Sequence, residues 1–99
     1  MENNELKVNV TYNAGSIRYY ATINRGREVL FSFWPSPVDP ALWDFDLPEA
    51  NRYPWFVSPD GFPVEYVKHL IQSIYFIRYG GTDFPEVVFT KEARKILGI

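Results

Sequence analysis

Several chemistries are excluded by what the sequence lacks. It contains no cysteine, so a disulfide bond, a zinc–thiolate cluster and a cysteine nucleophile are impossible. Its one histidine, His69, has no neighbours spaced to complete a zinc site. No apolar run approaches the roughly 20 residues of a bilayer-spanning helix, and the polar start of the chain lacks the pattern of a signal peptide. We therefore expect a cytoplasmic protein without a membrane segment.

Excess positive charge is also missing. Ten basic residues stand against twelve acidic ones, which gives a net charge of −2. Generic binding to nucleic acid or to an anionic membrane is therefore not expected. The acidity is concentrated, because residues 34–63 contain five acidic side chains and one basic one. Such a segment favours a protein partner with a basic surface.

The segment 34–63 is also unusual in its rings and prolines. It contains seven of the eight prolines and all three tryptophans of the chain. Disordered segments are poor in aromatic residues, whereas proline opposes long helices and central strands. We therefore predict a long, ordered, irregular loop that is strand-like only over Tyr53–Val57.

Regular alternation and helical spacing predict the rest of the fold. Apolar and polar residues alternate over 5–13, 17–24 and 27–34, which indicates three strands joined by short turns. An apolar face with helical spacing predicts a helix over 64–79 that packs on these strands. Residues 87–89 form a predicted fourth strand.

A short helix is predicted over 91–97, capped by Thr90 and closed by Gly98. The chain 1–99 is thus expected to be a single α+β domain. Its antiparallel meander of three strands plus a fourth packs against one main helix, with the long Pro/Trp-rich loop and the short final helix beside them.

In the third strand, alternation predicts two different faces. Val29, Phe31 and Phe33 fall on the face that the helix should cover. Leu30 and Trp34 fall on the opposite face. We expect rings of the 34–63 loop to cover that second face.

Residues for partner binding are predicted mainly in the same loop. Tryptophan and tyrosine are enriched among residues that dominate binding energy, and nearby aspartates would add charge. The candidates are Trp43, Asp44, Phe45, Asp46, Tyr53, Trp55 and Phe76. Asp44 and Asp46 could also hold Mg²⁺ or Ca²⁺, but no calcium-loop pattern is present. Solvated loop charges are the simpler interpretation, and no metal or cofactor is predicted.

Phe76 falls on the polar side of the predicted helix. Either another part of the chain covers it, or it contacts a partner, including a second copy in a homodimer. His69 lies on the same side and is interpreted as solvent-facing.

Arg18, Arg25 and Arg27 lie near three tyrosines, a combination that can hold single-stranded nucleic acid. No recognised motif accompanies them, so ordinary hairpin arginines are the simpler interpretation. The tyrosines are Tyr12, Tyr19 and Tyr20.

The function predicted from these patterns is binding without catalysis. No triad, phosphate-binding loop or paired acid–base motif is present, so an enzyme is not expected. The leading hypothesis is a small protein-binding module: an inhibitor, immunity-type protein, adaptor or assembly factor. By analogy alone, phage-encoded inhibitors of host defence belong to this class. The alternative is binding of a small ligand or carbohydrate to the loop rings, which requires a concave pocket beside Trp43 and Trp55.

Overall fold

A computed structural model describes most of the chain. The described residues are 5–39, 42–47, 55–57, 62–80 and 85–99, and only the backbone is described for 55–57. The predictions for Tyr53 and for the other residues between these ranges lie outside the described part.

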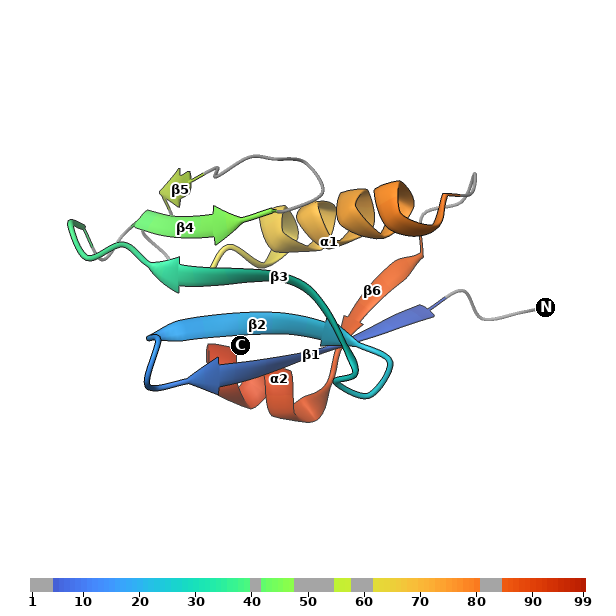
Figure 1. Cartoon of the computed structure of the whole chain (residues 1–99), viewed down its shortest axis with the longest axis horizontal. Helices are drawn as coiled ribbons and strands as arrows, with labels where there is room; N and C mark the ends of the chain where they lie inside the picture. Colours follow the sequence, from blue (N-terminus) through green and yellow to red (C-terminus); the bar gives the residue numbers. More distant parts are fainter. Residues whose placement is uncertain (1–4, 40–41, 48–54, 58–61, 81–84) are drawn as a thin grey trace.

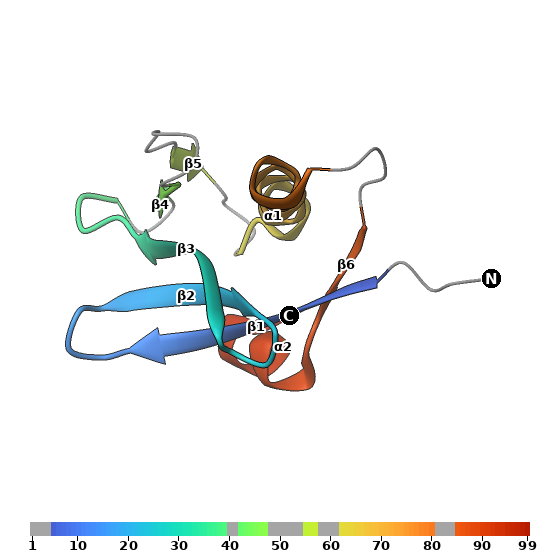
Figure 2. The same cartoon turned by 45° about the vertical axis from the view of Figure 1, so that its right-hand side comes forward.

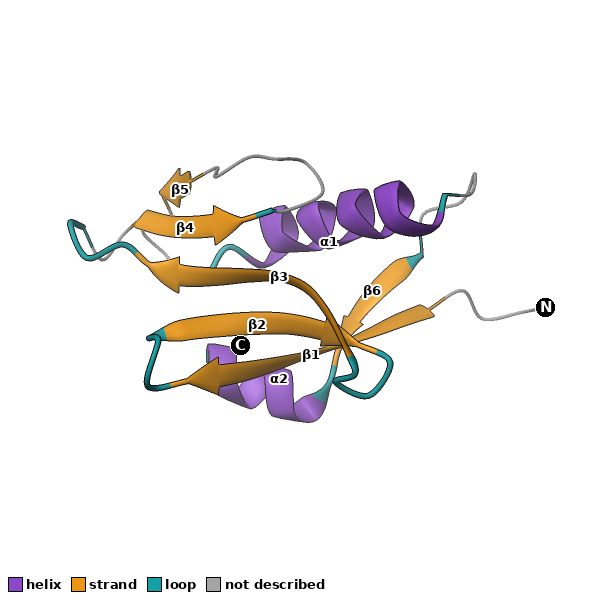
Figure 3. Cartoon of the chain, viewed as in Figure 1, coloured by secondary structure: helices purple, strands orange, loops and turns teal. Residues whose placement is uncertain are grey.

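The described strands form one mixed sheet with the order β5-β4-β3-β2-β1-β6 (Figures 1 and 3). Neighbours from β1 to β5 are antiparallel, as in a meander. β6 instead runs parallel to β1, so the predicted fourth strand exists but the prediction of a purely antiparallel sheet is wrong at this edge. The strands are β1 (Glu5–Asn13), β2 (Arg18–Ile23), β3 (Glu28–Pro35), β4 (Leu42–Asp46), β5 (Trp55–Val57) and β6 (Glu86–Phe89).

Strand β4 corrects the prediction that the segment 34–63 is an irregular loop. It pairs with β3, so that Phe33 lies opposite Phe45 and Trp34 opposite Asp44. The physical reason is the placement of the prolines: Pro40 precedes the strand and Pro48 follows it, so the residues between them keep their backbone donors. β5 confirms the strand-like backbone predicted around Trp55.

Two helices cover one face of the sheet. α1 (Val64–Tyr79) and α2 (Lys91–Leu97) both lie behind the front strands in Figure 1, and Figure 2 shows them on the same side. Both helices match their predicted ranges. Thr90 accepts a hydrogen bond from the Ala93 backbone N–H at 3.1 Å and caps α2 as predicted. Gly98 ends that helix in the left-handed conformation that glycine adopts readily.

A bulge in β3 changes the predicted faces of that strand. Ala21 pairs with Phe31 but Thr22 pairs with Val29, which leaves Leu30 as an extra residue. Leu30 is therefore 0% exposed and Val29 is 48% exposed, the reverse of the predicted assignment. Trp34 keeps its predicted position on the second face. Of the rings expected to cover that face, the described ones, Trp43, Phe45 and Phe62, pack in or against the core instead.

The core lies between the sheet and the two helices. It joins alternate residues of the strands to the buried face of α1, Val67, Ile71 and Ile74, and to Ala93 of α2. Burial of this apolar surface is the main source of stability. In the described part of the chain, no helix covers the other face of the sheet (Figure 1).

Candidate functional site on the helix-free face

Strand β4 divides the predicted acidic–aromatic site between two faces. Because side chains alternate along a strand, Trp43 and Phe45 point to the core while Asp44 and Asp46 point to the helix-free face. The four residues therefore form no single surface. The sequence hypothesis grouped them because it assumed an irregular loop, in which alternation does not apply.

The two inward rings belong to the core. Phe45 is fully buried. Its ring stacks on Phe33 with centroids 5.8 Å apart and meets the edge of Tyr66 at 5.6 Å. Trp43 is half-buried, and its ring lies 5.3 Å from that of Phe62. Packing on the helix side accounts for both rings, and a role of either in partner binding stays a prediction.

The outward residues form a row across three strands. Strand pairing places Arg18 of β2 beside Trp34 of β3, and Trp34 opposite Asp44 of β4. The Arg18 guanidinium carbon lies 4.2 Å from the centre of the Trp34 ring. Arg18 Nη1 also lies 3.9 Å from Asp46 Oδ2. We call Arg18, Trp34, Asp44 and Asp46 the charged-aromatic patch.

The patch combines a flat apolar ring with charges of both signs. Arg18 and Asp46 are partly exposed, at 40% and 32% of their side-chain surfaces, so their attraction is weakened by solvent. The cation over the ring adds an attraction of about 0.5–1 kcal/mol at such exposure. These contacts restrain the Trp34 and Arg18 side chains within the protein.

Sequence reasoning did not predict the contact between Arg18 and Trp34, although it did predict the face on which Trp34 lies. Alternation with buried Phe33 already placed Trp34 on the second face. The neighbour across the strands was not predictable, because the register of β2 against β3 depends on the tertiary fold.

A small hollow lies at the end of the patch. Its volume is about 270 Å³, and Ile17, Arg18, Trp34 and Pro37 contribute to its lining. Ile17 is 63% exposed, so an apolar side chain extends the Trp34 surface toward the turn between β1 and β2. The pocket beside Trp43 and Trp55 that carbohydrate binding would require stays a prediction, because the Trp55 side chain lies outside the described part of the chain.

The side-chain positions of two predicted aromatic residues, Tyr53 and Trp55, are not described, so their predicted roles stay untested. Tyr53 lies outside the described residues. Trp55 has a described backbone, which pairs with Asp44 in the same cross-strand row. Phe76 is 43% exposed on α1 beside exposed Ile77, and its role in an intermolecular contact stays a prediction.

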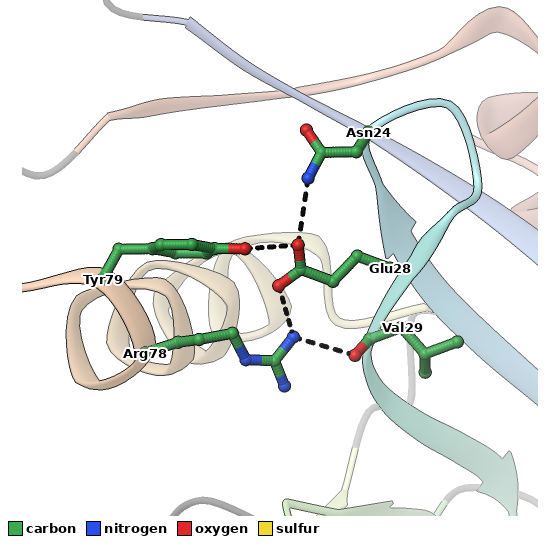
Figure 4. Close-up of polar contacts among 5 residues, drawn as sticks. All are labelled: Asn24, Glu28, Val29, Arg78 and Tyr79. Carbon is green, nitrogen blue, oxygen red and sulfur yellow. Dashed lines mark hydrogen bonds and ion pairs between the residues drawn. The ribbon is translucent and has the colours of Figure 1, made fainter.

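A second polar cluster joins the end of α1 to the hairpin between β2 and β3 (Figure 4). Arg78 Nη1 donates to Glu28 Oε2 at 2.7 Å and to the Val29 carbonyl at 3.0 Å. Tyr79 and Asn24 donate to the other carboxylate oxygen, Asn24 at 2.9 Å. The hydrogen bond from Tyr79 and then the one from Arg78 lower the pKa of Glu28 below 4.5. The same carboxylate raises the pKa of Tyr79 above 10.0.

This cluster is best explained as a clasp that holds a helix end against a turn. Each oxygen of Glu28 is satisfied within the protein, and its side chain is 23% exposed. Because Glu28 and Arg78 are 50 residues apart in the sequence, no local pattern predicted their pairing.

The arginines considered for nucleic-acid binding do not form one site. Arg25 and Arg27 line a hollow at the turn after β2, together with Glu28. Arg18 lies at the opposite end of β2. Six strand residues separate these ends by roughly 20 Å, and Arg18 is already engaged by Trp34. His69 is exposed on α1.

The described ranges contain neither a cluster of metal-binding side chains nor a membrane-spanning helix. There, no group of three or more histidine, aspartate or glutamate side chains is arranged to hold a metal ion. No helix of that part is long and apolar enough to cross a bilayer.

No protein-family model, no curated protein and no solved structure matches this chain.

Proposed function

We propose that this protein is a small, non-catalytic protein-binding module that uses the charged-aromatic patch. The observation that carries the proposal is the stacking of Arg18 on Trp34 next to Asp44 and Asp46, on a sheet face without a helix cover. Tryptophan and arginine are the residue types that most often dominate binding energy at interfaces. An inhibitor, immunity-type protein, adaptor or assembly factor would use such a surface.

The charges favour a partner with a basic surface. Asp44 and Asp46 carry carboxylates that can accept hydrogen bonds from a partner, and Asp46 is only partly neutralised by Arg18 at 3.9 Å. The chain from 34 to 63 carries a net charge of −4, from five acidic residues and Arg52. A basic partner would gain in association rate from this charge, and the gain would decrease with salt.

Small-ligand or carbohydrate binding remains the alternative. The hollow beside Trp34 supports it, because an aromatic ring borders a concave space. It is less favoured than protein binding, since the Arg18 guanidinium already covers the Trp34 ring and Trp43 packs in the core. Arg52, which was considered as part of a polar rim, lies outside the described residues.

The proposal is tested by affinity capture followed by titration. The tagged protein would be incubated with a lysate of the organism that encodes it, and a captured protein would be titrated against purified variants by calorimetry. We expect Trp34→Ala to weaken binding about 30-fold, the effect of losing a central anchor of about 2 kcal/mol. Asp44→Lys should weaken binding most strongly at low salt.

The control is Lys95→Ala, which changes an exposed charge on α2 on the helix-covered side of the sheet. It should bind like the unaltered protein. The proposal fails if Trp34→Ala and Asp44→Lys, both folded by circular dichroism, bind the captured protein as tightly as the control does.

A further inference from the structure

Strand β6 leaves one side of its backbone without a neighbouring strand. It ends the order of the sheet and pairs only with β1 among the described strands. The Thr90 N–H donates to the Val8 carbonyl of β1 at 3.0 Å. Because the direction of backbone groups alternates along a strand, Val87 and Phe89 direct their N–H and C=O groups away from β1.

The free side of β6 opens into a groove between the two helices. The groove has a volume of about 490 Å³. Val64 and Lys68 of α1 line one wall, Arg94 and Ile99 line the other, and β6 contributes Glu86–Phe89. Figure 2 shows β6 at the edge of the sheet, with α1 beside its upper part and α2 at its lower end.

Just before β6, a side chain of α1 provides a hydrogen bond to a backbone carbonyl that has no neighbouring strand. Gln72 Nε2 donates to the carbonyl of Pro85 at 2.8 Å. Pro85 is two residues before Val87, and backbone groups two residues apart point to the same side of a strand. The Pro85 carbonyl therefore also points away from β1. In the part of the chain that the structure describes, no side chain bonds to the backbone of Val87 or Phe89 in this way. Val87 and Phe89 both line the groove.

Charge favours one kind of occupant. Lys68 and Arg94 line the groove together with one acidic side chain, that of Glu86. Lys68 Nζ lies 3.8 Å from Glu65 Oε2, but this glutamate side chain is 84% exposed and its attraction is weak. Val64 and Ile99 add apolar surface between the charges.

We propose that this groove binds an extended peptide segment with acidic side chains, which adds to β6 as a further strand. The outward backbone groups of Val87 and Phe89 would hydrogen-bond to the peptide backbone. Alternate peptide side chains would meet Lys68 and Arg94, and the others would meet the apolar walls. The site is separate from the charged-aromatic patch and does not depend on the function proposed for it.

The probe is a capped heptapeptide that alternates valine and glutamate, compared with one that alternates valine and lysine. Each would be titrated into the ¹⁵N-labelled protein by NMR. The acidic peptide should shift the amide signals of Val87 and Phe89 and slow their hydrogen exchange. The basic peptide should bind at least fivefold more weakly.

Charge reversal tests the walls of the groove. Lys68→Glu combined with Arg94→Glu should weaken the acidic peptide about tenfold, as expected for two partly exposed ion pairs. The same double variant should gain affinity for the basic peptide. The control Lys95→Glu reverses a positive charge on α2 outside the groove and should change the affinity less than twofold.

Three results would overturn this proposal. The first is no shift of these amides at millimolar acidic peptide. The second is peptide-induced shifts around Trp34 instead of β6. The third is concentration-dependent shifts of Val87 and Phe89 without peptide, with dimers in sedimentation, because a second copy of the chain would then occupy the edge.

Discussion

Trp34 and Trp43 lie on neighbouring strands and face opposite sides of the sheet, so their removal should have different costs. Trp43 packs on Phe62 at 5.3 Å between ring centroids, and on Phe33 and Tyr19 at 6.0 Å each. Replacing a fully buried tryptophan by alanine costs about 3–5 kcal/mol. Because Trp43 is only half-buried, we expect Trp43→Ala to lower the free energy of unfolding by about 2–3 kcal/mol.

Trp34 makes its described ring contact with Arg18 on the helix-free face. Trp34→Ala loses this attraction, about 0.5–1 kcal/mol, and some partly buried area. A total of about 1 kcal/mol follows. For a domain of this size, each kcal/mol lowers the melting temperature by about 4–8 °C. We therefore expect a decrease of about 5 °C for Trp34→Ala and of about 10–20 °C for Trp43→Ala.

The assay is urea and thermal unfolding followed by far-ultraviolet circular dichroism, since each variant loses a fluorophore. Both variants should keep the denaturant slope of the unaltered protein. Equal losses, or a larger loss for Trp34→Ala, would refute the assignment of the two rings to opposite faces. Either result would also mean that the Trp34 ring is needed for stability, so that Trp34→Ala could not be used to test binding by the charged-aromatic patch.

Two further predictions concern the polar contacts. Glu28→Gln should lower the free energy of unfolding by about 1 kcal/mol at pH 7. The pKa of Glu28 is lowered in the folded state, so its contribution is present above pH 4.5 and is lost as the pH falls through the folded pKa. Urea unfolding of both proteins from pH 7 to pH 3 should show this difference shrinking, and a constant difference would contradict the clasp. Thr90→Ala should cost about 1 kcal/mol by removing the cap of α2, and it also removes a 2.6 Å hydrogen bond to Asn9. Thr11→Ala is an exposed control, and equal melting temperatures for the two variants would argue against the cap.

The sequence predicted the elements whose periodicity is local. Alternating side chains identified the first three strands, and the spacing of apolar residues identified α1. Thr90 and Gly98 marked both ends of α2, because capping depends on side chains within one turn. In the same way, the α+β class followed from the order of these elements.

Other features depended on contacts between distant segments. β4 became a strand because β3 offered it an edge to pair with, and the prolines at 40 and 48 lie outside the paired residues. β6 runs parallel to β1, a choice that β6's own residues do not encode. The bulge at Leu30 exchanged the faces of Val29 and Leu30 in β3. Its position depends on how β3 pairs with β2, which the sequence of β3 alone does not show.

By itself, the sequence determined a small domain without cysteine chemistry and without a recognised catalytic motif. It also determined where acidic and aromatic residues concentrate. Tertiary structure alone decided which of them share a surface: it turned Trp43 and Phe45 into the core, turned Asp44 and Asp46 outward, and brought Arg18 onto Trp34. The physical reason is that strand pairing sets register and face over long sequence distances, and local composition contains neither.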